Sequence, residues 1–215
     1  MKFADRWNRF VYAFWAPVYD ALMRFHPVSQ IRSRAFDLVN IHDAASVLLV
    51  GVGTGVDLEF LNPSSLIVAA DISIPMLRHS RKKAQQLNIP IVSVCSDASQ
   101  LPCGDDSFEV VVLTLLVSVV PDPQACLTES LRVLRPGGRI MVLDKFVPTG
   151  QRPSIPRRFL NLLIRPFGTD INRRWEDISS ELGPALSDEA TTPGSSIRAI
   201  VVQKPGKPQD YSMPR

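Results

Sequence analysis

The chain has 215 residues, of which 45% are hydrophobic and 21% are charged. These values are typical of one globular domain, and they exclude a disordered, collagen-like or purely coiled-coil chain. No uncharged run reaches the ~18 to 20 residues that would cross a bilayer. Charged residues interrupt the start of the chain, so no apolar signal-peptide core is found there and we expect a cytoplasmic location. The cysteines Cys95, Cys103 and Cys126 are too few and too scattered for a disulfide framework or a zinc site.

The net charge is only +3, but basic residues gather in two segments. Residues 1–34 carry a net charge of +4 and residues 151–174 a net charge of +5, which leaves −6 for the remainder of the chain. Two basic segments beside an acidic remainder predict an anionic partner on one side of the molecule. Scattered, solvated charge is the simpler alternative.

Short apolar runs alternate with helical patterns, which is typical of a parallel sheet whose strands are joined by crossover helices. The apolar runs are nearly continuous, as in strands buried on both faces. Strands are predicted at Ser46–Val50, Leu66–Ala70, Ile89–Cys95, Phe108–Leu113 and Arg139–Leu143. Helices are predicted at Val56–Leu61, Pro75–Leu87 and Pro123–Leu134, and Pro136-Gly137-Gly138 is predicted to turn the chain into the fifth strand.

The two ends of the chain carry different patterns. Trp7, Phe10, Val11 and Phe14 recur at helical spacing, so residues 1–34 are predicted to form a helical lid or membrane-contact segment. After residue 146, helices are predicted at Arg157–Leu163 and Asn172–Leu182, and a last strand at Ile197–Val202. We therefore divide the chain into the segment 1–34, a domain of residues 35–203 with a helical insertion at 151–182, and a flexible tail of residues 204–215.

A glycine-rich loop, Val50-Gly51-Val52-Gly53-Thr54-Gly55, follows the first predicted strand. Glycines at alternate positions let the backbone turn tightly and approach a ligand with no Cβ in the way. The dinucleotide fingerprint places its third glycine three positions after its second, where this chain has Val56. The spacing therefore favours S-adenosylmethionine (SAM) over a dinucleotide, with an ordinary strand-to-helix turn as the alternative.

Acidic residues follow the next two strands. Asp71 stands at the end of the second strand, where a carboxylate can accept both hydroxyls of an adenosine ribose. The alternative is an N-cap for the helix that follows. Asp97 and Ala98 come after the third strand and suit an adenine edge, with Asp97 accepting a hydrogen bond from the exocyclic amine.

An ordered set of short motifs runs through residues 44–146: Gly51-Val52-Gly53-Thr54-Gly55, Asp71, Asp97-Ala98, Leu101-Pro102, Asp106-Ser107-Phe108-Glu109-Val110-Val111 and Leu134-Arg135-Pro136-Gly137-Gly138. This set resembles the class I SAM-dependent methyltransferases. The resemblance implies an α/β, Rossmann-like, doubly wound fold. In that fold, a mostly parallel seven-stranded sheet with one antiparallel strand near an edge carries helices on both faces.

The resemblance also implies a donor-binding set for SAM, whose co-product is S-adenosylhomocysteine (SAH). The glycines would line the methionine part, Asp71 the ribose, and Ile72 and Met76 the adenine ring. The whole set is Tyr19, Val50, Gly51, Gly53, Thr54, Gly55, Asp71, Ile72, Met76, Asp97, Ala98, Leu113 and Thr114. One position departs from the family, which usually has Asp or Glu where this chain has Leu49. That departure keeps open the alternative of a SAM-fold protein that has lost catalysis.

Further motifs are similar to those of two subfamilies. Val117–Pro123 is similar to bacterial phosphatidylethanolamine N-methyltransferases, and Ala16–Asp20 to the quinone-ring C-methyltransferases of ubiquinone and menaquinone synthesis. The resemblance implies a small or lipid-like acceptor, first a phospholipid headgroup amine, with a prenylated quinone ring as the alternative. The aromatic N-terminal stripe and Phe159–Phe167 would then contact the anionic inner face of the membrane, or instead form a lid over the donor.

Substrate-side candidates come from three parts of the chain. Tyr12 and Tyr19 could hold a methylated cation against their rings. Asp144 follows the fifth strand, and Arg173 could bind a phosphate. An ion pair or a helix cap is the alternative role for these charged residues. Nucleic acid is disfavoured as an acceptor, because the fourth strand ends in Leu113–Leu116 and lacks the Asn/Asp-Pro-Pro-aromatic motif of adenine methylation.

Overall fold

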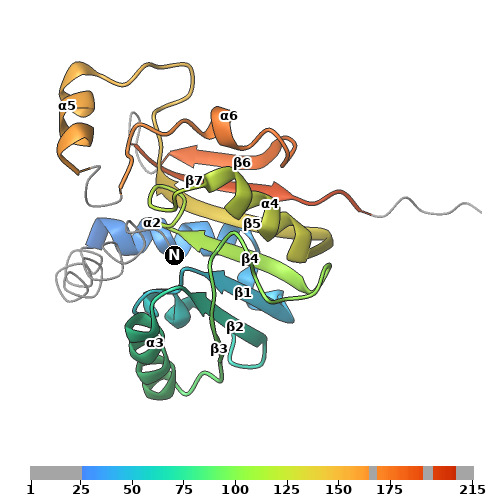
Figure 1. The fold of residues 1–215 in the computed structure, drawn as a ribbon. Helices are drawn as coiled ribbons and strands as arrows, with labels where there is room; N and C mark the ends of the chain where they lie inside the picture. Colours follow the sequence, from blue (N-terminus) through green and yellow to red (C-terminus); the bar gives the residue numbers. More distant parts are fainter. Residues whose placement is uncertain (1–25, 165–168, 191–195, 207–215) are drawn as a thin grey trace, which may run out of the picture.

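The computed structural model of the chain describes residues 26–164, 169–190 and 196–206. Its described part is built on one sheet with helices on both faces (Figure 1). The strands are β1 (Ser46–Val50), β2 (Leu66–Asp71), β3 (Val92–Cys95), β4 (Phe108–Thr114), β5 (Leu134–Lys145), β6 (Ala185–Ala190) and β7 (Ile197–Gln203). The helices are α2 (His26–Leu38), α3 (Ile74–Leu87), α4 (Pro123–Val133), α5 (Ile155–Ile164) and α6 (Trp175–Ile178), with 3₁₀ helices η1 (Ile41–Asp43) and η2 (Val56–Phe60).

The sheet has seven strands in the order β3-β2-β1-β4-β5-β7-β6. Neighbouring strands from β3 to β5 are parallel, whereas β7 runs antiparallel to both β5 and β6. The chain order reverses between β1 and β4, and ligands of open α/β sheets bind outside the carboxyl ends of the strands at such a point. The predicted fold class is therefore confirmed, including the antiparallel strand near one edge.

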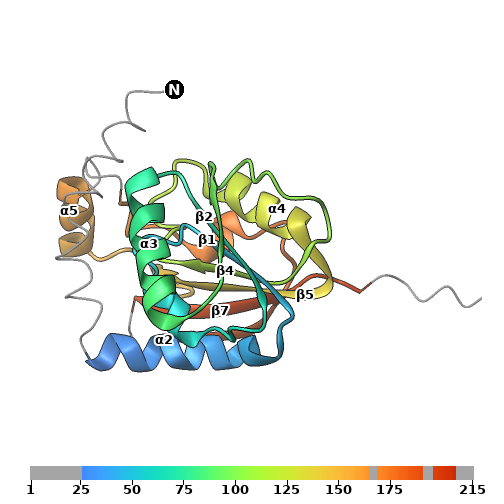
Figure 2. The ribbon, with the colours of Figure 1, turned by 90° about the horizontal axis from the view of Figure 1, so that it is seen from below.

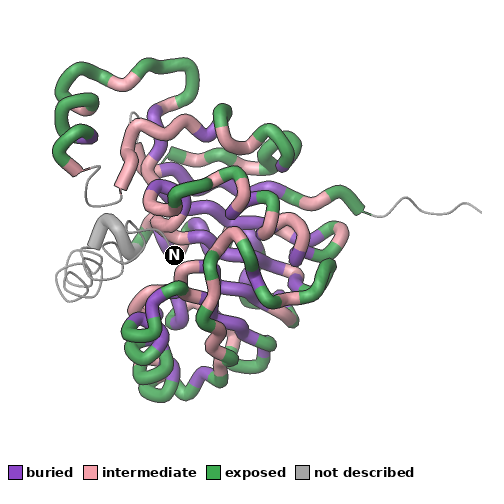
Figure 3. The backbone as a smooth tube through the Cα atoms, in the orientation of Figure 1, coloured by how far each residue is buried: buried purple, intermediate pink, exposed green. Residues whose placement is uncertain are grey.

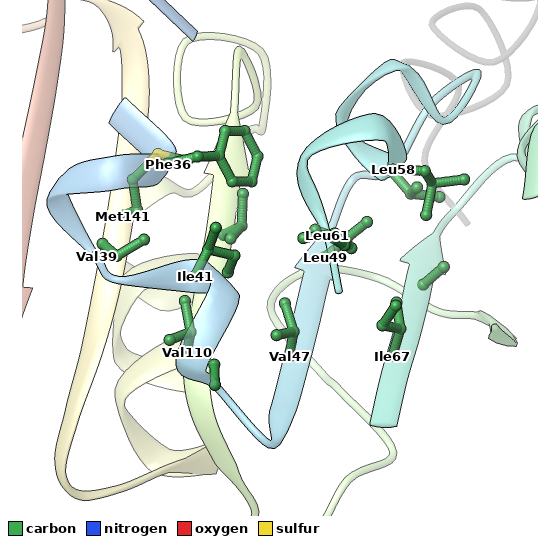
Figure 4. Close-up of a cluster of buried hydrophobic side chains, with 14 of the residues drawn as sticks. Phe36, Val39, Ile41, Val47, Leu49, Leu58, Leu61, Ile67, Val110 and Met141 are labelled. Carbon is green, nitrogen blue, oxygen red and sulfur yellow. The ribbon is translucent and has the colours of Figure 1, made fainter. Parts of the chain in front are cut away.

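Each face of the sheet is covered by its own apolar layer. On one face α3 packs against β2 and β3 and α2 against β5 and β7, with η1 and η2 in the same layer and Phe36, Leu49 and Leu58 in the core (Figures 2 and 4). On the other face α4 and the region of α6 cover β4 and β5, with Leu127 and Trp175 buried. The central strands are accordingly buried along almost their whole length (Figure 3). The two hydrophobic layers hold the strands in position, and the predicted site residues lie at the carboxyl ends of these strands.

Local sequence signals explain where the crossover helices begin and end. Proline stands in the first turn of both α3 and α4, where its missing N–H costs nothing. Asp122 caps α4 by accepting the Ala125 N–H at 2.9 Å. Asn88 ends α3 in the left-handed conformation (φ 54°), with its N–H turned back to the carbonyls of the last turn. These signals account for the close agreement between the predicted and observed bounds of α3 and α4.

The structure corrects several predicted elements. The helix predicted at Asn172–Leu182 is only the single turn of α6, because Ser179 leaves the helical conformation and the Leu182 N–H returns to the Ser179 carbonyl. The segment predicted as a helix at Val56–Leu61 is the 3₁₀ helix η2. The third strand starts at Val92, after Pro90, and β5 begins at Leu134 before the predicted turn.

Two further elements were not anticipated. The edge strand β6 was missed, since its sequence Ala-Leu-Ser-Asp-Glu-Ala lacks β-branched residues and its charges belong to an exposed edge. Helix α2 crosses residue 34, where the sequence analysis separates the N-terminal segment from the domain. The predicted stripe of Trp7, Phe10, Val11 and Phe14 lies outside the described residues. Within the described ranges, no helix is long and apolar enough to span a bilayer.

Candidate active site

The glycine-rich loop lies at the carboxyl end of β1, tied to the neighbouring strand. The N–H groups of Gly51 and Val52 both donate to the Ala70 carbonyl, at 2.8 and 3.0 Å. Gly55 adopts φ 85° and packs so closely on α3 that an added Cβ would lie 3.0 Å from the Ser80 Cα. The predicted tight turn is therefore present, and the loop turns straight into η2.

Gly53 lies half-buried in the middle of this loop. Its φ of 55° favours glycine, yet an added Cβ would meet no atom within 4 Å. Its backbone therefore borders open space that a ligand can fill. The Gly53 N–H donates to Asp71 Oδ2 at 2.9 Å, which joins the loop to the end of β2.

Asp71 is a partly buried carboxylate at this junction. Its second oxygen, Oδ1, accepts the Ser73 N–H at 2.8 Å. Burial raises the pKa of Asp71, and the two backbone hydrogen bonds oppose that shift. Each carboxylate oxygen has two acceptor positions, so both retain capacity for a ribose hydroxyl. The alternative role of Asp71, at the start of α3, has some support. Asp71 accepts the N–H of Ser73, the residue that precedes the helix, whereas the Ser73 side chain itself makes no capping hydrogen bond.

Buried hydroxyl groups without hydrogen-bond partners lie at the ends of the adjacent strands. Ser73 Oγ follows β2 and Ser96 Oγ follows β3. A buried polar atom that lacks a partner is costly unless a ligand or water satisfies it. Together with the open space at Gly53, these hydroxyls fit a polar, hydroxyl-bearing ligand such as the nucleoside and amino-acid parts of SAM.

The other predicted donor-binding residues come together at the same edge. Ile72 is 40% exposed and Met76 is buried in the first turn of α3. Asp97 is exposed and accepts both the backbone and hydroxyl hydrogens of Ser99 at 2.8 Å. The remaining members of the set, Val50, Thr54, Ala98 and Leu113, belong to the same strand ends or the loops that follow them. Tyr12 and Tyr19 lie outside the described residues.

Asp144 has no exposed surface. Its Oδ2 accepts the Ser118 N–H at 2.8 Å and its Oδ1 the Lys145 N–H at 2.7 Å. Burial raises the pKa of Asp144, and the hydrogen bonds from Ser118 and Lys145 partly offset this effect. In this conformation Asp144 fixes the loop that follows β4 and offers no surface to a substrate.

Arg173 is engaged with the same loop. Its guanidinium donates to the carbonyls of Val117 and Val120, the latter at 2.7 Å. Burial lowers the pKa of Arg173, and nearby carboxylates led by Asp170 oppose that shift. In this structure Arg173 therefore stabilises the loop after β4, and its guanidinium is hydrogen-bonded to backbone carbonyls of that loop.

One buried pair was not singled out from the sequence. Arg32 Nε of α2 lies 3.3 Å from Asp57 Oδ1 of η2, and their side chains are only 4% and 11% exposed. Asp57 comes two residues after the last glycine of the loop. The closeness of Asp57 to the glycine-rich loop in the sequence is the signal that could have identified this residue. The helical pattern assigned to this stretch gave Asp57 no role, because a charged residue on a short helix is expected to face solvent.

The fold and the site together define a candidate nucleotide-type donor site of the class I methyltransferase kind: a glycine loop after β1, an acidic residue at the end of β2, and polar groups at the ends of β3 and β4. Residues 48–142 match the family model described as a methyltransferase domain. Over this stretch, which is less than half of its length, the chain is similar to that family.

Two curated relatives are similar over a comparable stretch. A phosphatidylethanolamine N-methyltransferase of Cereibacter sphaeroides is 36% identical over 138 residues, which are 63% of this chain and 66% of the relative. A demethylmenaquinone methyltransferase of Thermus thermophilus is 35% identical over 136 residues, which are 60% of this chain and 61% of the relative. The chain thus spans somewhat less than two thirds of the length of these relatives.

A solved structure extends the likeness at the level of the fold. The crystal structure of the cyclase SpnF superposes with a TM-score of 0.69, covering 83% of this chain and 82% of the cyclase at 16% identity. Such a likeness concerns the fold alone. Because one fold hosts different chemistries, the reaction has to be argued from the site.

Proposed function

We propose that this protein transfers a methyl group from SAM to the amine of a phospholipid headgroup, working at a membrane surface. The family of residues 48–142 supports the donor and the reaction type. The acceptor is inferred from the similarity to a phosphatidylethanolamine N-methyltransferase and from the polarity of helix α5. The second of these is the observation that carries the proposal.

Helix α5 buries polar side chains and exposes apolar ones, the opposite of a helix that packs on a hydrophobic core. Asn161 is buried and its Oδ1 accepts the Ile171 N–H at 2.8 Å, while Arg157 Nε donates to the Ile171 carbonyl at 3.1 Å. These residues are four apart and share one face of the helix. The apolar side chains on the remaining surface are exposed: Ile155 by 70%, Phe159 by 67%, Leu160 by 51%, Leu162 by 67% and Leu163 by 69%.

The charge around α5 suits an anionic lipid surface. Arg152 and Arg158 are exposed beside the apolar residues, within the segment 151–174 that carries a net charge of +5. An amphipathic helix with exposed aromatic and leucine residues inserts its apolar side into the headgroup boundary, and adjacent arginines meet lipid phosphate. Figure 1 shows α5 standing away from the sheet, so nothing in the described part of the chain covers this face.

A chain of hydrogen bonds joins α5 to the loop that follows β4. Ile171 is bound by α5, and the neighbouring Asp170 N–H donates to the Ser118 carbonyl at 2.8 Å. Ser118 lies in the loop that follows β4 and is held by Asp144. A lipid seated against α5 would therefore present its headgroup near the end of β4.

Methyl transfer mainly requires that the acceptor atom, the methyl carbon and the sulfur of SAM lie in line. SAM supplies a methyl group that its sulfonium already activates. The protein's task is to hold a neutral amine in line with that methyl group and to exclude water. Methylation of a quinol carbon would further need a base to remove the phenolic proton. A headgroup ammonium likewise has to lose a proton before transfer, and Asp144, which is buried and bonded to backbone N–H groups, is not placed in this conformation to accept a proton from either acceptor.

Incubation of the full chain with methyl-labelled SAM and a total bacterial lipid extract tests the proposal. We expect label in the phospholipid fraction, and more of it when phosphatidylethanolamine is added. Label in the quinone fraction would instead support ring C-methylation, the activity named for the Thermus thermophilus relative. Label in neither fraction would reject both acceptors. Absence of SAH binding by calorimetry would reject the methyltransferase reaction itself in favour of a degenerate SAM-fold protein.

A further inference from the structure

Helix α3 carries a concentration of positive charge. Residues 72–96, which include the whole helix, have a net charge of +4 and contain no acidic residue. The charge comes from Arg78, Arg81, Lys82 and Lys83. It was not singled out from the sequence, because acidic residues before and after this stretch hide it in the average over the central part of the chain.

The basic side chains lie mainly on the face of α3 that points away from the sheet. Arg78, Arg81 and Lys82 are exposed, and their spacings of three and four residues place them on one side of the helix. Ile74, one turn before Arg78, is 46% exposed and belongs to the same stripe. These four residues form the outer face of α3. The opposite face is buried against β2 and β3 and consists of Met76, Leu77, Ser80 and Ala84.

Nothing in the described part of the chain neutralises the outer face of α3. Lys83 Nζ lies 3.9 Å from Glu59 Oε2 of η2, but Arg78, Arg81 and Lys82 form no ion pair or side-chain hydrogen bond with the described residues. Like charges three or four residues apart on a helix repel each other and destabilise it. Anionic groups bound along this face would offset that repulsion.

The position of α3 favours a lipid surface as the source of those anionic groups. Helix α3 follows the carboxyl end of β2, and the segment that leads to α5 follows the carboxyl end of the parallel strand β5. Figures 1 and 2 show α3 and α5 toward the same side of the molecule, at the left of both views. The exposed apolar side chains of α5 suit a bilayer and do not suit a nucleic acid. Lipid phosphate at the same surface would attract the arginine and lysine side chains of α3.

We propose that the outer face of α3 binds the phosphate groups of anionic phospholipids, as a second membrane contact beside α5. Two contacts restrict how the molecule is turned on the membrane more than one contact does. The carboxyl edge of the sheet, from which both elements are reached, would then lie toward the lipid. The inference deepens the proposed function and rests on its membrane surface, but it does not depend on which headgroup atom receives the methyl group.

Flotation of the full chain with vesicles tests the inference. On vesicles of phosphatidylcholine and phosphatidylglycerol, we expect the double substitution Arg78→Gln and Lys82→Gln to weaken binding by about tenfold or more, because each removed charge contributes to the attraction of an anionic leaflet. On vesicles of phosphatidylcholine alone, wild type and variant should bind equally. The control, Arg135→Gln with Arg139→Gln, removes the same net charge at the amino edge of the sheet and should bind the anionic vesicles as the wild type does.

Further measurements separate the loss of charge from a loss of folding. Glutamine has a helix propensity close to that of arginine and lysine, so thermal unfolding and SAH binding of the neutralised α3 variant should match those of the wild type. Arg78→Lys with Arg81→Lys keeps the charge and should keep vesicle binding. Added salt should weaken the binding of the wild type to anionic vesicles more than that of the neutralised variant, because salt screens exposed charges.

Equal binding of wild type and neutralised variant to the anionic vesicles, or no binding by the wild type, would overturn the inference. If the neutralised variant kept its vesicle binding but lost binding to a short single-stranded oligonucleotide, the outer face of α3 would belong to a nucleic-acid partner and the inference would again be wrong. Absence of methyl transfer to the lipid extract would instead overturn the proposed function and leave the vesicle result as it stands, so the two failures are distinguishable.

Discussion

Three carboxylates at the carboxyl edge of the sheet have distinct partners and therefore distinct tasks. Asp71 accepts two backbone N–H groups and keeps further acceptor capacity on both oxygens. Asp57 is ion-paired with Arg32. Asp144 accepts backbone N–H groups from two segments and has no exposed surface. Burial raises the pKa of all three, but only the first two adjoin the glycine loop.

Asp144→Asn tests the structural task of the third carboxylate. An asparagine has one acceptor oxygen, so it loses one of the two backbone hydrogen bonds and leaves a buried N–H unsatisfied, at a cost of about 1 to 3 kcal/mol. The measurement is urea unfolding of wild type and variant at pH 4 and pH 7. We expect the variant to be the less stable protein at pH 4.

The pH dependence of that difference has a definite sign. The folded-state pKa of Asp144 lies above the ordinary value of 3.8, because burial penalises its charge. Between the two values the folded protein binds more protons than the unfolded chain, so this group's contribution to stability falls as the pH rises through that window. The variant lacks the titration, and its deficit relative to wild type should shrink from pH 4 to pH 7. A deficit that is constant or grows would contradict the raised pKa.

At the scale of elements, agreement with the sequence-based prediction follows the strength of the local signal. β1 has its predicted bounds, Ser46–Val50, because a continuous apolar run ends at a glycine. Helix α3 has a proline at one end and an asparagine in the left-handed conformation at the other. The candidate donor-binding residues after β1 and β2 were singled out for the same reason, since glycines follow the first strand and an acidic residue ends the second.

Elements that depend on tertiary contacts were not predictable in this way. Strand β6 has weak propensity and is held by its antiparallel pairing to β7, with Arg198 Nε donating to Asp188 Oδ1 at 2.9 Å. The inward face of α5 is polar because Asn161 and Arg157 bind the backbone at Ile171, a partner ten or more residues away. Asp57 was missed because its partner Arg32 comes from a separate helix. Periodicity alone contains none of these pairings.

The double substitution Phe159→Glu and Leu162→Glu tests the membrane contact of α5. Both side chains are 67% exposed, so we expect the free energy of unfolding to change by no more than about 0.5 kcal/mol per site. Binding to vesicles containing anionic phospholipid should fall tenfold or more in a sedimentation assay, because two apolar anchors become charged.

The matched control is Leu186→Glu on β6, which is 58% exposed and belongs to a different element. It should leave vesicle binding unchanged. If the α5 variant and the control bind vesicles equally well, α5 does not anchor the protein to lipid and the apolar face has another partner.

At the scale of the whole molecule, the strand order assembles the site from segments far apart in the chain. β1 lies between β2 and β4, so the glycine loop, Asp71 and Thr114 meet at one edge although they are spread over about 60 residues. A ligand bound there contacts segments that only the folded chain brings together. Its binding free energy therefore adds to the stability of the entire fold.

Thermal unfolding with and without SAH measures this coupling. At a concentration one hundred times its Kd, SAH should stabilise the wild-type protein by about 2.7 kcal/mol, which raises Tm by roughly 5 to 11 °C for a chain of this size. Asp71→Ala removes charge-assisted hydrogen bonds to the ribose, at an expected loss of about 1 to 3 kcal/mol in binding. At the same SAH concentration, bound SAH should then stabilise the folded Asp71→Ala variant by between about 0.3 and 1.8 kcal/mol.

Each shift is compared with the ligand-free Tm of the same variant, so the intrinsic effect of losing the Gly53 and Ser73 hydrogen bonds cancels. The control Asp43→Ala removes an exposed carboxylate just before β1, at the opposite edge of the sheet, and should respond to SAH as the wild type does. A full-sized shift in Asp71→Ala would mean that Asp71 only organises the start of α3. Its two backbone hydrogen bonds would then be its whole contribution, and the ribose would have to be bound from another strand end.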